Sequence, residues 1–328
     1  MKEILNELIA HRSLDSASAK RVLIDMASGK YNPSQMSAFM TVYMMRTVTI
    51  EELQGFRDAM LELCIAVDTQ APVMDVCGTG GDGKNTFNIS TLSSFVVAAA
   101  GQPVAKHGNY GVSSVSGSSN VLEYFGYRFT NNQESLQQDM ERSNIFFMHA
   151  PLFHPAMKHV APIRKELGVK TFFNMLGPMV NPARPQHQLV GVFSLELARL
   201  YGYLYQKTEK RFVILHDLQG YDEVSLTGPF KMYTQAGEEV WEPSDLALQT
   251  VRPEDLKGGD TVEEAASIFL RILEGKGTVA QHEVVIANAA LALFCCDRQA
   301  GIVAALVKAR NALESGAAYR AFKSLINH

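Results

Sequence analysis

A run of glycines, acids, hydroxyls and amides stands directly before an apolar helix at residues 75–91, DVCGTGGDGKNTFNIST. Its glycines allow positive φ angles and close approach of the backbone to a ligand. A helix after such a turn presents unpaired N–H groups and the positive end of its dipole, which favour phosphate. The spacing matches neither a Walker loop nor GxGxxG. The run therefore predicts an anion site; the alternative is an ordinary glycine-rich turn with Ser90 as the helix N-cap.

A second polar loop, KHGNYGVSSVSGSS at residues 106–119, also separates an expected strand from an expected helix. Ligands of α/β sheets bind at the carboxyl ends of the strands, so two such loops predict one shared polyanion site. Lys106 would contribute a point charge to that site. The alternative is a solvated serine loop in which His107 bonds to the backbone.

Adjacent carboxylates follow the expected strand RFVILH, in the segment GYDEVSLTGP at residues 220–229. Acids beside a phosphate site require a cation between them, and Mg²⁺ binds one or two carboxylates while bridging phosphate oxygens. Asp222 and Glu223 are therefore candidate metal ligands. The alternative is a solvated acidic turn.

Arg164 lies in the expected helix APIRKELG and could bind a carboxylate through two parallel hydrogen bonds if it faces a cleft. The alternative is a solvated arginine on a helix surface. His149, His154 and His159 are spaced by five residues, which matches no common zinc pattern. We expect these histidines to pack and to line polar space.

The elements that would position these residues change character near residue 70. Residues 1–69 predict short helices, including a capping box at Thr49 and Glu52. From there to residue 216, strand patterns alternate with helix patterns, which predicts a mainly parallel sheet. Residues 230–243 predict a hairpin turned at Ala236–Gly237, and the chain from Thr261 is mostly helical. The expected fold is a small helical domain (1–69, completed by a helical segment near 155–185) and a larger α/β domain (70–328).

Composition excludes several classes of protein. The 328 residues are 47% apolar with a net charge of −4, so nothing global attracts nucleic acid or an anionic membrane. No apolar run reaches the roughly 18 residues of a membrane span, and MKEILNELIAHRSLD resembles an amphipathic helix rather than a signal peptide. The four cysteines include no CxxC pair. These features predict a cytoplasmic protein in a reducing compartment.

The chain closely resembles the anthranilate phosphoribosyltransferases over essentially its whole length. The motifs that carry the resemblance occur in the family's order and spacing; they are GTGGDG with TFNISTLSSFVVAAAG, VAKHGN with VSSVSGSSNVLE, APLFHPAMKHVAPIRKELGVKTFFNMLGPMVNP, QLVGVF and GYDEVSLTGP. The resemblance implies the nucleoside phosphorylase/phosphoribosyltransferase type of α/β fold. It also implies transfer of the phosphoribosyl group of phosphoribosyl pyrophosphate to the amine of anthranilate, in tryptophan biosynthesis with Mg²⁺ present.

The family's site residues carry over to matching positions of this chain. For phosphoribosyl pyrophosphate they are Gly78, Gly81, Asp82, Thr86, Asn88, Ser90, Thr91, Lys106, Gly108, Asn109, Ser113, Ser114 and Ser118. For anthranilate they are Gly78, Asn109, His154, Arg164 and Pro178, with His107 lining the aromatic pocket. For the metal they are Ser90, Asp222 and Glu223. His107 is a candidate for orienting the amine and Arg164 for binding the carboxylate, and no general base is assigned.

The chain departs from the common family pattern at four positions. Many members read KHGNRSVSSKSGS, so Tyr110 replaces an arginine, Gly111 a serine and Val115 a lysine. Two positive charges are therefore absent near the expected polyanion. His149 stands where a phenylalanine is expected and could alter the mouth of the aromatic pocket.

Two other functions remain open at this stage. A pyrimidine nucleoside phosphorylase shares the architecture but uses phosphate as the nucleophile. A non-catalytic relative that binds nucleic acid would need a strongly basic face and no intact acid pair. The resemblance further implies a homodimer formed through the helical domain, for which MTVYMMRTV at residues 40–48 offers an apolar stripe; a domain core explains that stripe equally well.

Overall fold

The computed structural model describes residues 1–111 and 115–327. The chain divides into two compact units. The helical unit comprises Met1–Val67 and Ala150–Pro182, and the α/β unit comprises Asp68–His149 and Ala183–His328. The predicted combination of an N-terminal helical domain with a larger, mainly parallel α/β domain is confirmed.

The helical unit is built from short helices that begin at capping residues. They are α1 (Lys2–Ile9), α2 (Ser16–Ala27), α3 (Pro33–Met45), α4 (Ile50–Leu63), α8 (Ala150–Phe153), α9 (Ala161–Leu167) and the 3₁₀ helices η1 (Pro155–His159), η2 (Phe172–Met175) and η3 (Gly177–Val180). Thr49 and Glu52 form the predicted capping box of α4. The amphipathic helix expected within MKEILNELIAHRSLD ends at Ile9, because the chain turns at His11 with a φ of +58°.

Aromatic rings hold the two segments of the helical unit together. Phe56 of α4 stacks on Phe172 of η2 with ring centroids 4.4 Å apart, and Phe39 and Tyr43 of α3 pack edge-on against both rings. Such pairs add to the free energy gained by burying their apolar surface. The segment 150–182 is therefore an integral part of this unit's core.

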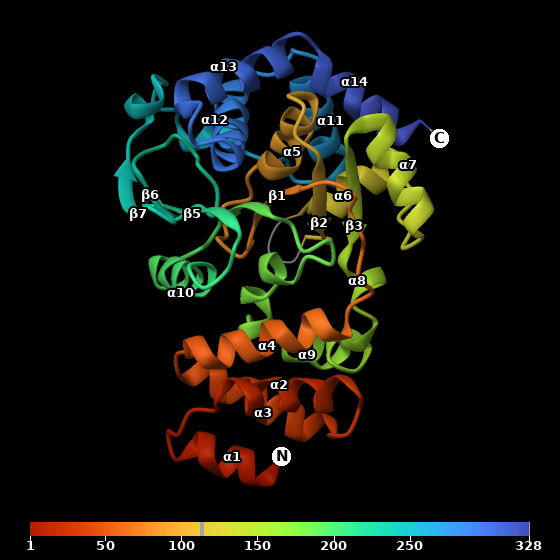
Figure 1. Cartoon of the computed structure of the whole chain (residues 1–328), viewed down its shortest axis with the longest axis vertical. Helices are drawn as coiled ribbons and strands as arrows, with labels where there is room; N and C mark the ends of the chain where they lie inside the picture. The colour runs from red at the N-terminus through yellow and green to blue at the C-terminus, as the bar shows by residue number, and fades with distance from the viewer. Residues whose placement is uncertain (112–114, 328) are drawn as a thin grey trace. The chain divides into compact units, whose positions relative to one another are not determined.

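The α/β unit contains a seven-stranded sheet (Figure 1). Its strands are β1 (Met74–Gly78), β2 (Val104–Gly108), β3 (Ile145–His149), β4 (His187–Gly191), β5 (Arg211–Asp217), β6 (Phe230–Thr234) and β7 (Gly237–Trp241). Its helices are α5 (Ile89–Ala99), α6 (Ser118–Tyr124), α7 (Gln133–Ser143), α10 (Leu195–Tyr205), α11 (Val262–Leu273), α12 (Val279–Cys296), α13 (Gly301–Glu314), α14 (Ala317–Ile326), η4 (Pro243–Leu246) and η5 (Pro253–Leu256).

The topological switch point of the sheet, where the chain order of the strands reverses, lies between β1 and β4. The order is β3-β2-β1-β4-β5-β6-β7, with β1 to β5 parallel and β6 and β7 antiparallel. Gly78 pairs with Gly191 at the carboxyl ends of the two strands that meet there. Open α/β sheets bind their ligands at this position.

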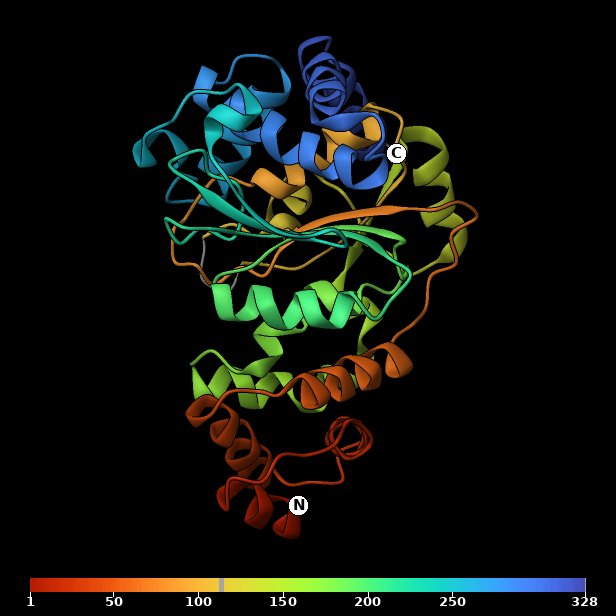
Figure 2. The ribbon, with the colours of Figure 1, turned by 60° about the vertical axis from the view of Figure 1, so that its left-hand side comes forward.

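Helices cover both faces of the sheet. In Figure 2, α12, α13 and α14 lie on one face and α10 lies on the other. In the described part of the chain, α12 alone has the length and apolar composition of a membrane span, and 61% of it is buried inside the unit. Its burial against α5 and α13 accounts for that composition, although the sequence had led us to expect no such segment.

Two local features differ from the sequence-based expectation. The hairpin between β6 and β7 turns at residues 235–236, because Gly237 already pairs with Thr234. Helix α7 was not predicted, since its sequence QESLQQDMERS carries almost no apolar face. Its Asn132 side chain caps it, and Leu136 anchors it in the core.

Candidate active site

Two strand-tip glycines allow the segment around Asp222 to lie against the sheet edge. A Cβ on Gly191 would collide with the carbonyl oxygen of Asp222, and a Cβ on Gly78 would collide with the Asp222 carboxylate. Only glycine permits this approach without displacing backbone. The sequence pointed to Gly78 but not to Gly191, which lies inside the segment QLVGVF and carried no signal of its own.

Asp222 joins its own segment to the loop after β1. Its Oδ2 accepts a hydrogen bond from the Gly80 N–H at 2.5 Å, and its N–H donates to Asp82 Oδ2 at 3.4 Å. Burial, and then repulsion from Glu223 and Asp82, raise the pKa of Asp222 well above its usual range. Bringing a cation to these carboxylates would relieve that repulsion.

Glu223 joins the same segment to the start of α5. Its Oε1 accepts a hydrogen bond from the Ser90 N–H at 2.8 Å. Ser90 is therefore not the N-cap: Asn88 holds that position without a side-chain capping bond, and the carboxylate of Glu223 binds an N–H of the first turn. Burial, with repulsion from Asp82, raises the pKa of Glu223 to about 7.

Lys106 brings a buried positive charge to this cluster from β2. Its side chain is 2% exposed, and its Nζ donates to the Val76 carbonyl at 2.6 Å and to Ser90 Oγ at 3.5 Å. Burial lowers the pKa of Lys106, while the charge of Asp75 opposes that shift. The ammonium group thus lies beside the first turn of α5, where an anion would also be stabilised by the helix N-terminus.

The loop after β2 is tied to the loop after β1. Asn88 Nδ2 donates to the Ser116 carbonyl at 3.0 Å. Asn120 Oδ1 accepts from the N–H groups of Gly111 and Gly117, both at 2.9 Å, which closes the loop on itself. Hydrogen bonds therefore connect the described parts of all three predicted loops.

The remaining predicted residues of the α/β unit have the following positions. Gly81 and Asp82 lie in the loop after β1, and Thr86 forms an isolated β-bridge with Lys257. Thr91 is buried in the first turn of α5. His107 and Gly108 are the last residues of β2, Asn109 is exposed, and Ser118 is the first residue of α6. Ser118 Oγ donates to the Asn109 carbonyl at 3.3 Å. Ser113 and Ser114 lie outside the described residues.

Two departures from the family pattern contact each other beside the second loop. Tyr110 packs edge-on against His149, with centroids 4.7 Å apart, and its hydroxyl donates to Glu123 Oε1 at 3.1 Å. The ring of His149 stacks on that of Phe129, and its Nδ1 forms a 2.9 Å hydrogen bond with Ser119 Oγ. Burial lowers the pKa of His149, which favours the neutral imidazole. His149 therefore packs within the α/β unit, as an aromatic residue would.

The other predicted anthranilate residues belong to the helical unit. Arg164 lies over the Phe173 ring, 5.1 Å from its centroid, and its Nη2 donates to Asn174 Oδ1 at 3.4 Å. Burial lowers the pKa of Arg164, so this arginine is not a solvated surface residue. His154 is also buried, which lowers its pKa to about 4. Pro178 is the second residue of η3 and is buried.

The donor set around Asp222 and Glu223 fits a magnesium ion completed by a ligand. Asp222 is buried and Glu223 is half-buried, and their charges repel each other. Across residues 1–111 and 115–327, however, no group of three His, Cys, Asp or Glu side chains could hold a metal by itself. Mg²⁺ usually binds one or two carboxylates and takes its other ligands from water and phosphate oxygens. The carboxylate pair therefore suits an ion that arrives with a diphosphate.

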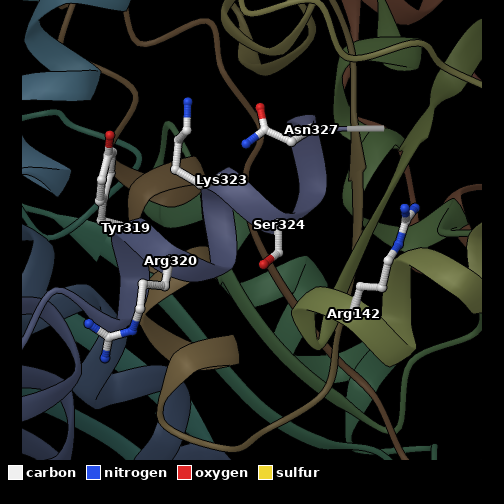
Figure 3. A pocket seen from close by; sticks show the side chains of 6 residues that line it. All are labelled: Arg142, Tyr319, Arg320, Lys323, Ser324 and Asn327. Carbon is white, nitrogen blue, oxygen red and sulfur yellow. The ribbon is translucent and has the colours of Figure 1, made fainter.

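A cavity of about 550 Å³ lies elsewhere, between α7 and α14 (Figure 3). It is lined by Arg142, Tyr319, Arg320, Lys323, Ser324 and Asn327, whose side chains point in different directions. Arg142 is paired with Asp139 at 2.8 Å and immediately precedes the amino end of β3. This cavity is therefore remote from the carboxyl ends of the strands, and we assign the site to the strand tips.

Comparison with known families agrees with this geometry. Residues 70–319 match the glycosyl transferase family α/β domain, and residues 2–64 match the helical bundle domain of the same family. The fold and the strand-tip site thus define a glycosyl transferase that combines both domains.

Individual relatives narrow the class. The anthranilate phosphoribosyltransferase of Christiangramia forsetii is 56% identical over 99% of this chain and 98% of its own, and that of Flavobacterium johnsoniae is 57% identical over the same shares. The Thermus thermophilus enzyme has a TM-score of 0.91 at 32% identity, covering 98% of both chains. The Saccharomyces cerevisiae enzyme, in complex with PRPP and Mg, has a TM-score of 0.91 at 27% identity and covers 98% of this chain and 96% of its own. This chain belongs to the anthranilate phosphoribosyltransferase family.

Proposed function

We propose that this chain transfers the phosphoribosyl group of phosphoribosyl pyrophosphate to the amine of anthranilate, giving N-(5-phosphoribosyl)anthranilate and pyrophosphate. One observation carries the proposal beyond family membership. The start of α5 is where Lys106, Glu223 and the glycine-rich loop are joined by hydrogen bonds. A buried ammonium group, a carboxylate pair and a helix N-terminus together suit a diphosphate that carries a divalent cation.

Phosphoribosyl pyrophosphate is proposed to bind the loops after β1 and β2. The residues are Gly78, Gly81, Asp82, Thr86, Asn88, Ser90, Thr91, Lys106, Gly108, Asn109, Ser113, Ser114 and Ser118. The backbone N–H groups of the first loop and the ammonium group of Lys106 would stabilise the charge that develops on the departing pyrophosphate. Because these donors are held in place before the substrate arrives, little reorganisation accompanies the reaction.

Magnesium is proposed to bind Asp222, Glu223 and Ser90. The bound cation would supply positive charge that stabilises the leaving group. The yeast relative in complex with PRPP and Mg supports the choice of metal. Within this chain, Gly78 and Gly191 allow the carboxylates to reach the strand tips.

Anthranilate is proposed to contact Gly78, Asn109, His154, Arg164 and Pro178. The guanidinium group of Arg164 would bind the carboxylate through two parallel hydrogen bonds. A yeast relative in complex with 4-fluoroanthranilate supports this substrate class. An aromatic amine needs little deprotonation before attack, so positioning contributes more than a strong base. His107 is proposed to orient the amine.

The assembly and location are also proposals. We propose a homodimer formed through the helical domain, in the cytoplasm, with no nucleic-acid or membrane partner. A net charge of −4 supports the absence of a nucleic-acid partner. We also propose residues 1–69 and 70–328 as the two domains, the first completed by the segment near 155–185.

A steady-state assay tests the proposed reaction. With phosphoribosyl pyrophosphate, anthranilate and Mg²⁺, we expect anthranilate fluorescence to fall as the substrate is consumed. When the metal is chelated, we expect the fluorescence to stay constant. Thymidine with inorganic phosphate tests the phosphorylase alternative and should yield no thymine. Phosphorolysis without phosphoribosyl transfer would overturn the proposal. A gel-shift assay with DNA tests the third function, and no shift is expected.

A further inference from the structure

A buried asparagine on a core helix forms hydrogen bonds with the segment that carries Asp222 and Glu223. Asn288 of α12 is 2% exposed. Its Oδ1 accepts from the Val224 N–H at 3.1 Å, and its Nδ2 donates to the Val224 carbonyl at 2.8 Å. The amide thus binds both polar groups of one residue, directly after Glu223.

The composition of α12 makes this asparagine unusual. Its neighbours in VVIANAALAL are apolar and buried, and an unpaired amide among them would be strongly unfavourable. Nδ2 also donates to the Val284 carbonyl of the same helix at 2.8 Å. Two donors and one acceptor are therefore used, which fixes the orientation of the side chain.

A second buried group holds the other side of the segment. Asp217 Oδ2 accepts from the Ser225 N–H at 3.1 Å and from Ser225 Oγ at 2.5 Å. Leu226 then takes a left-handed φ of +59°, and its carbonyl accepts from the Val251 N–H at 2.9 Å. Residues 224–226 are thus fixed from outside, although they belong to no helix or strand.

We propose that Asn288 is a positioning residue for the metal-binding carboxylates, a proposal that rests on the metal role given to Asp222 and Glu223. Because the backbone at Val224 is fixed, the side chain of the preceding residue, Glu223, projects from the backbone in a fixed direction. Glu223 can then reach both the Ser90 N–H and a cation. A carboxylate on an unrestrained loop would lose rotational freedom on binding the ion and would bind it more weakly.

Direct titration of the full-length protein with Mn²⁺ alone, followed by the EPR signal of the free ion, tests the inference. Asn288→Leu removes the hydrogen bonds while keeping a side chain of similar shape. Asn288→Ala removes the hydrogen bonds and also leaves a cavity. We expect both to raise the Mn²⁺ dissociation constant about tenfold or more. Leu291→Ala, one turn along the same buried helix, is the matched control for lost stability. It should lower Tm without changing Mn²⁺ affinity by more than about twofold.

A further variant separates failure of this inference from failure of the proposed metal site. Asp222→Asn combined with Glu223→Gln should abolish Mn²⁺ binding; unchanged binding would overturn the metal assignment itself. Loss of binding there, with wild-type affinity in both Asn288 variants, would overturn only the role of Asn288. Hydrogen exchange of the wild-type protein adds a test that needs no variant. The Val224 amide should be among the slowest of residues 220–229 without metal, and rapid exchange would contradict the inference.

Discussion

Glu223 serves at the start of α5 as the acceptor that a serine or asparagine side chain usually provides. The pattern NIST predicts a local cap, yet the acceptor of the Ser90 N–H comes from 133 residues further along the chain. Local sequence favours a capping serine but gives no sign of a distant carboxylate. The site residues could thus be chosen from their chemistry, while their hydrogen-bond partners depend on the tertiary fold.

The raised pKa of Glu223 predicts a pH dependence of metal binding. Because its pKa in the folded protein is about 7 instead of 4.5, a proton occupies the metal-free site at lower pH. The ion must displace that proton and any proton held by Asp222, whose pKa is also raised, so Mg²⁺ affinity should rise as the pH increases through about 7. Calorimetric titrations between pH 5.5 and 8.5 measure this. Equal affinity at every pH would contradict it, and Glu223→Gln should make the dependence shallower because only Asp222 then titrates.

The same shift predicts how the stability of the metal-free protein changes with pH. An acid whose pKa is raised on folding binds its proton more tightly in the folded state. Its contribution is therefore fully present below about pH 4.5 and is lost as the pH rises through about 7. In thermal melts, Mg²⁺ should consequently raise Tm more at pH 8 than at pH 6. A larger rise at pH 6 would contradict this.

Arg164 should act on one substrate more than the other. Arg164→Ala removes charge-assisted hydrogen bonds worth about 1.5–3 kcal/mol, so KM for anthranilate should rise roughly 10- to 100-fold. KM for phosphoribosyl pyrophosphate should change little. Lys165→Ala removes a neighbouring charge that is exposed on the same helix and should change neither constant. Equal effects of Arg164→Ala on both substrates would remove Arg164 from the anthranilate contacts.

At the scale of elements, the strand-tip glycines decide whether the Asp222 segment can cross the sheet edge. Strands β1, β2 and β4 belong to the predicted alternation of strand and helix patterns, because their apolar runs are short. Their neighbours could not be read from the sequence. The order of β1 and β4 depends on long-range pairing, so the close approach at Gly191 became visible only in the sheet.

Gly191→Ala should damage the site through the backbone. The new methyl group would collide with the Asp222 carbonyl oxygen, so we expect destabilisation by about 1–3 kcal/mol in urea unfolding and a lower affinity for Mg²⁺. Gly202→Ala in α10 is the control, since its nearest neighbour is the Tyr233 ring at 3.7 Å. It should stabilise the protein by about 0.5–1 kcal/mol. Wild-type stability and metal affinity in Gly191→Ala would contradict the account.

At the scale of the whole molecule, alternation of strand and helix patterns was sufficient to predict the α/β class. Helix α7 escaped prediction because helix periodicity depends on apolar residues that it lacks. Asn288 escaped for the opposite reason: its apolar neighbours predict a core helix, and nothing local shows that its amide faces a loop. Sequence patterns therefore predict layers well and side-chain partners across layers poorly.

The proposed homodimer predicts a change of oligomeric state on altering the helical domain. Met45 is 84% exposed and Met44 43% exposed at the end of α3. If these side chains are buried between two copies, Met44→Glu with Met45→Glu should yield monomers in sedimentation velocity. Val303→Glu, at a 72% exposed position on α13, should leave the dimer intact. An unchanged dimer in the methionine variant would place the interface elsewhere.

Anomalous diffraction from crystals soaked with Mn²⁺ and phosphoribosyl pyrophosphate tests directly whether the strand tips hold the metal and the diphosphate. We expect one metal peak or more on Asp222 and Glu223, with the diphosphate at the loop after β1 and the first turn of α5, beside Lys106. A diphosphate bound away from those strand tips, or a metal that contacts neither carboxylate, would contradict this expectation.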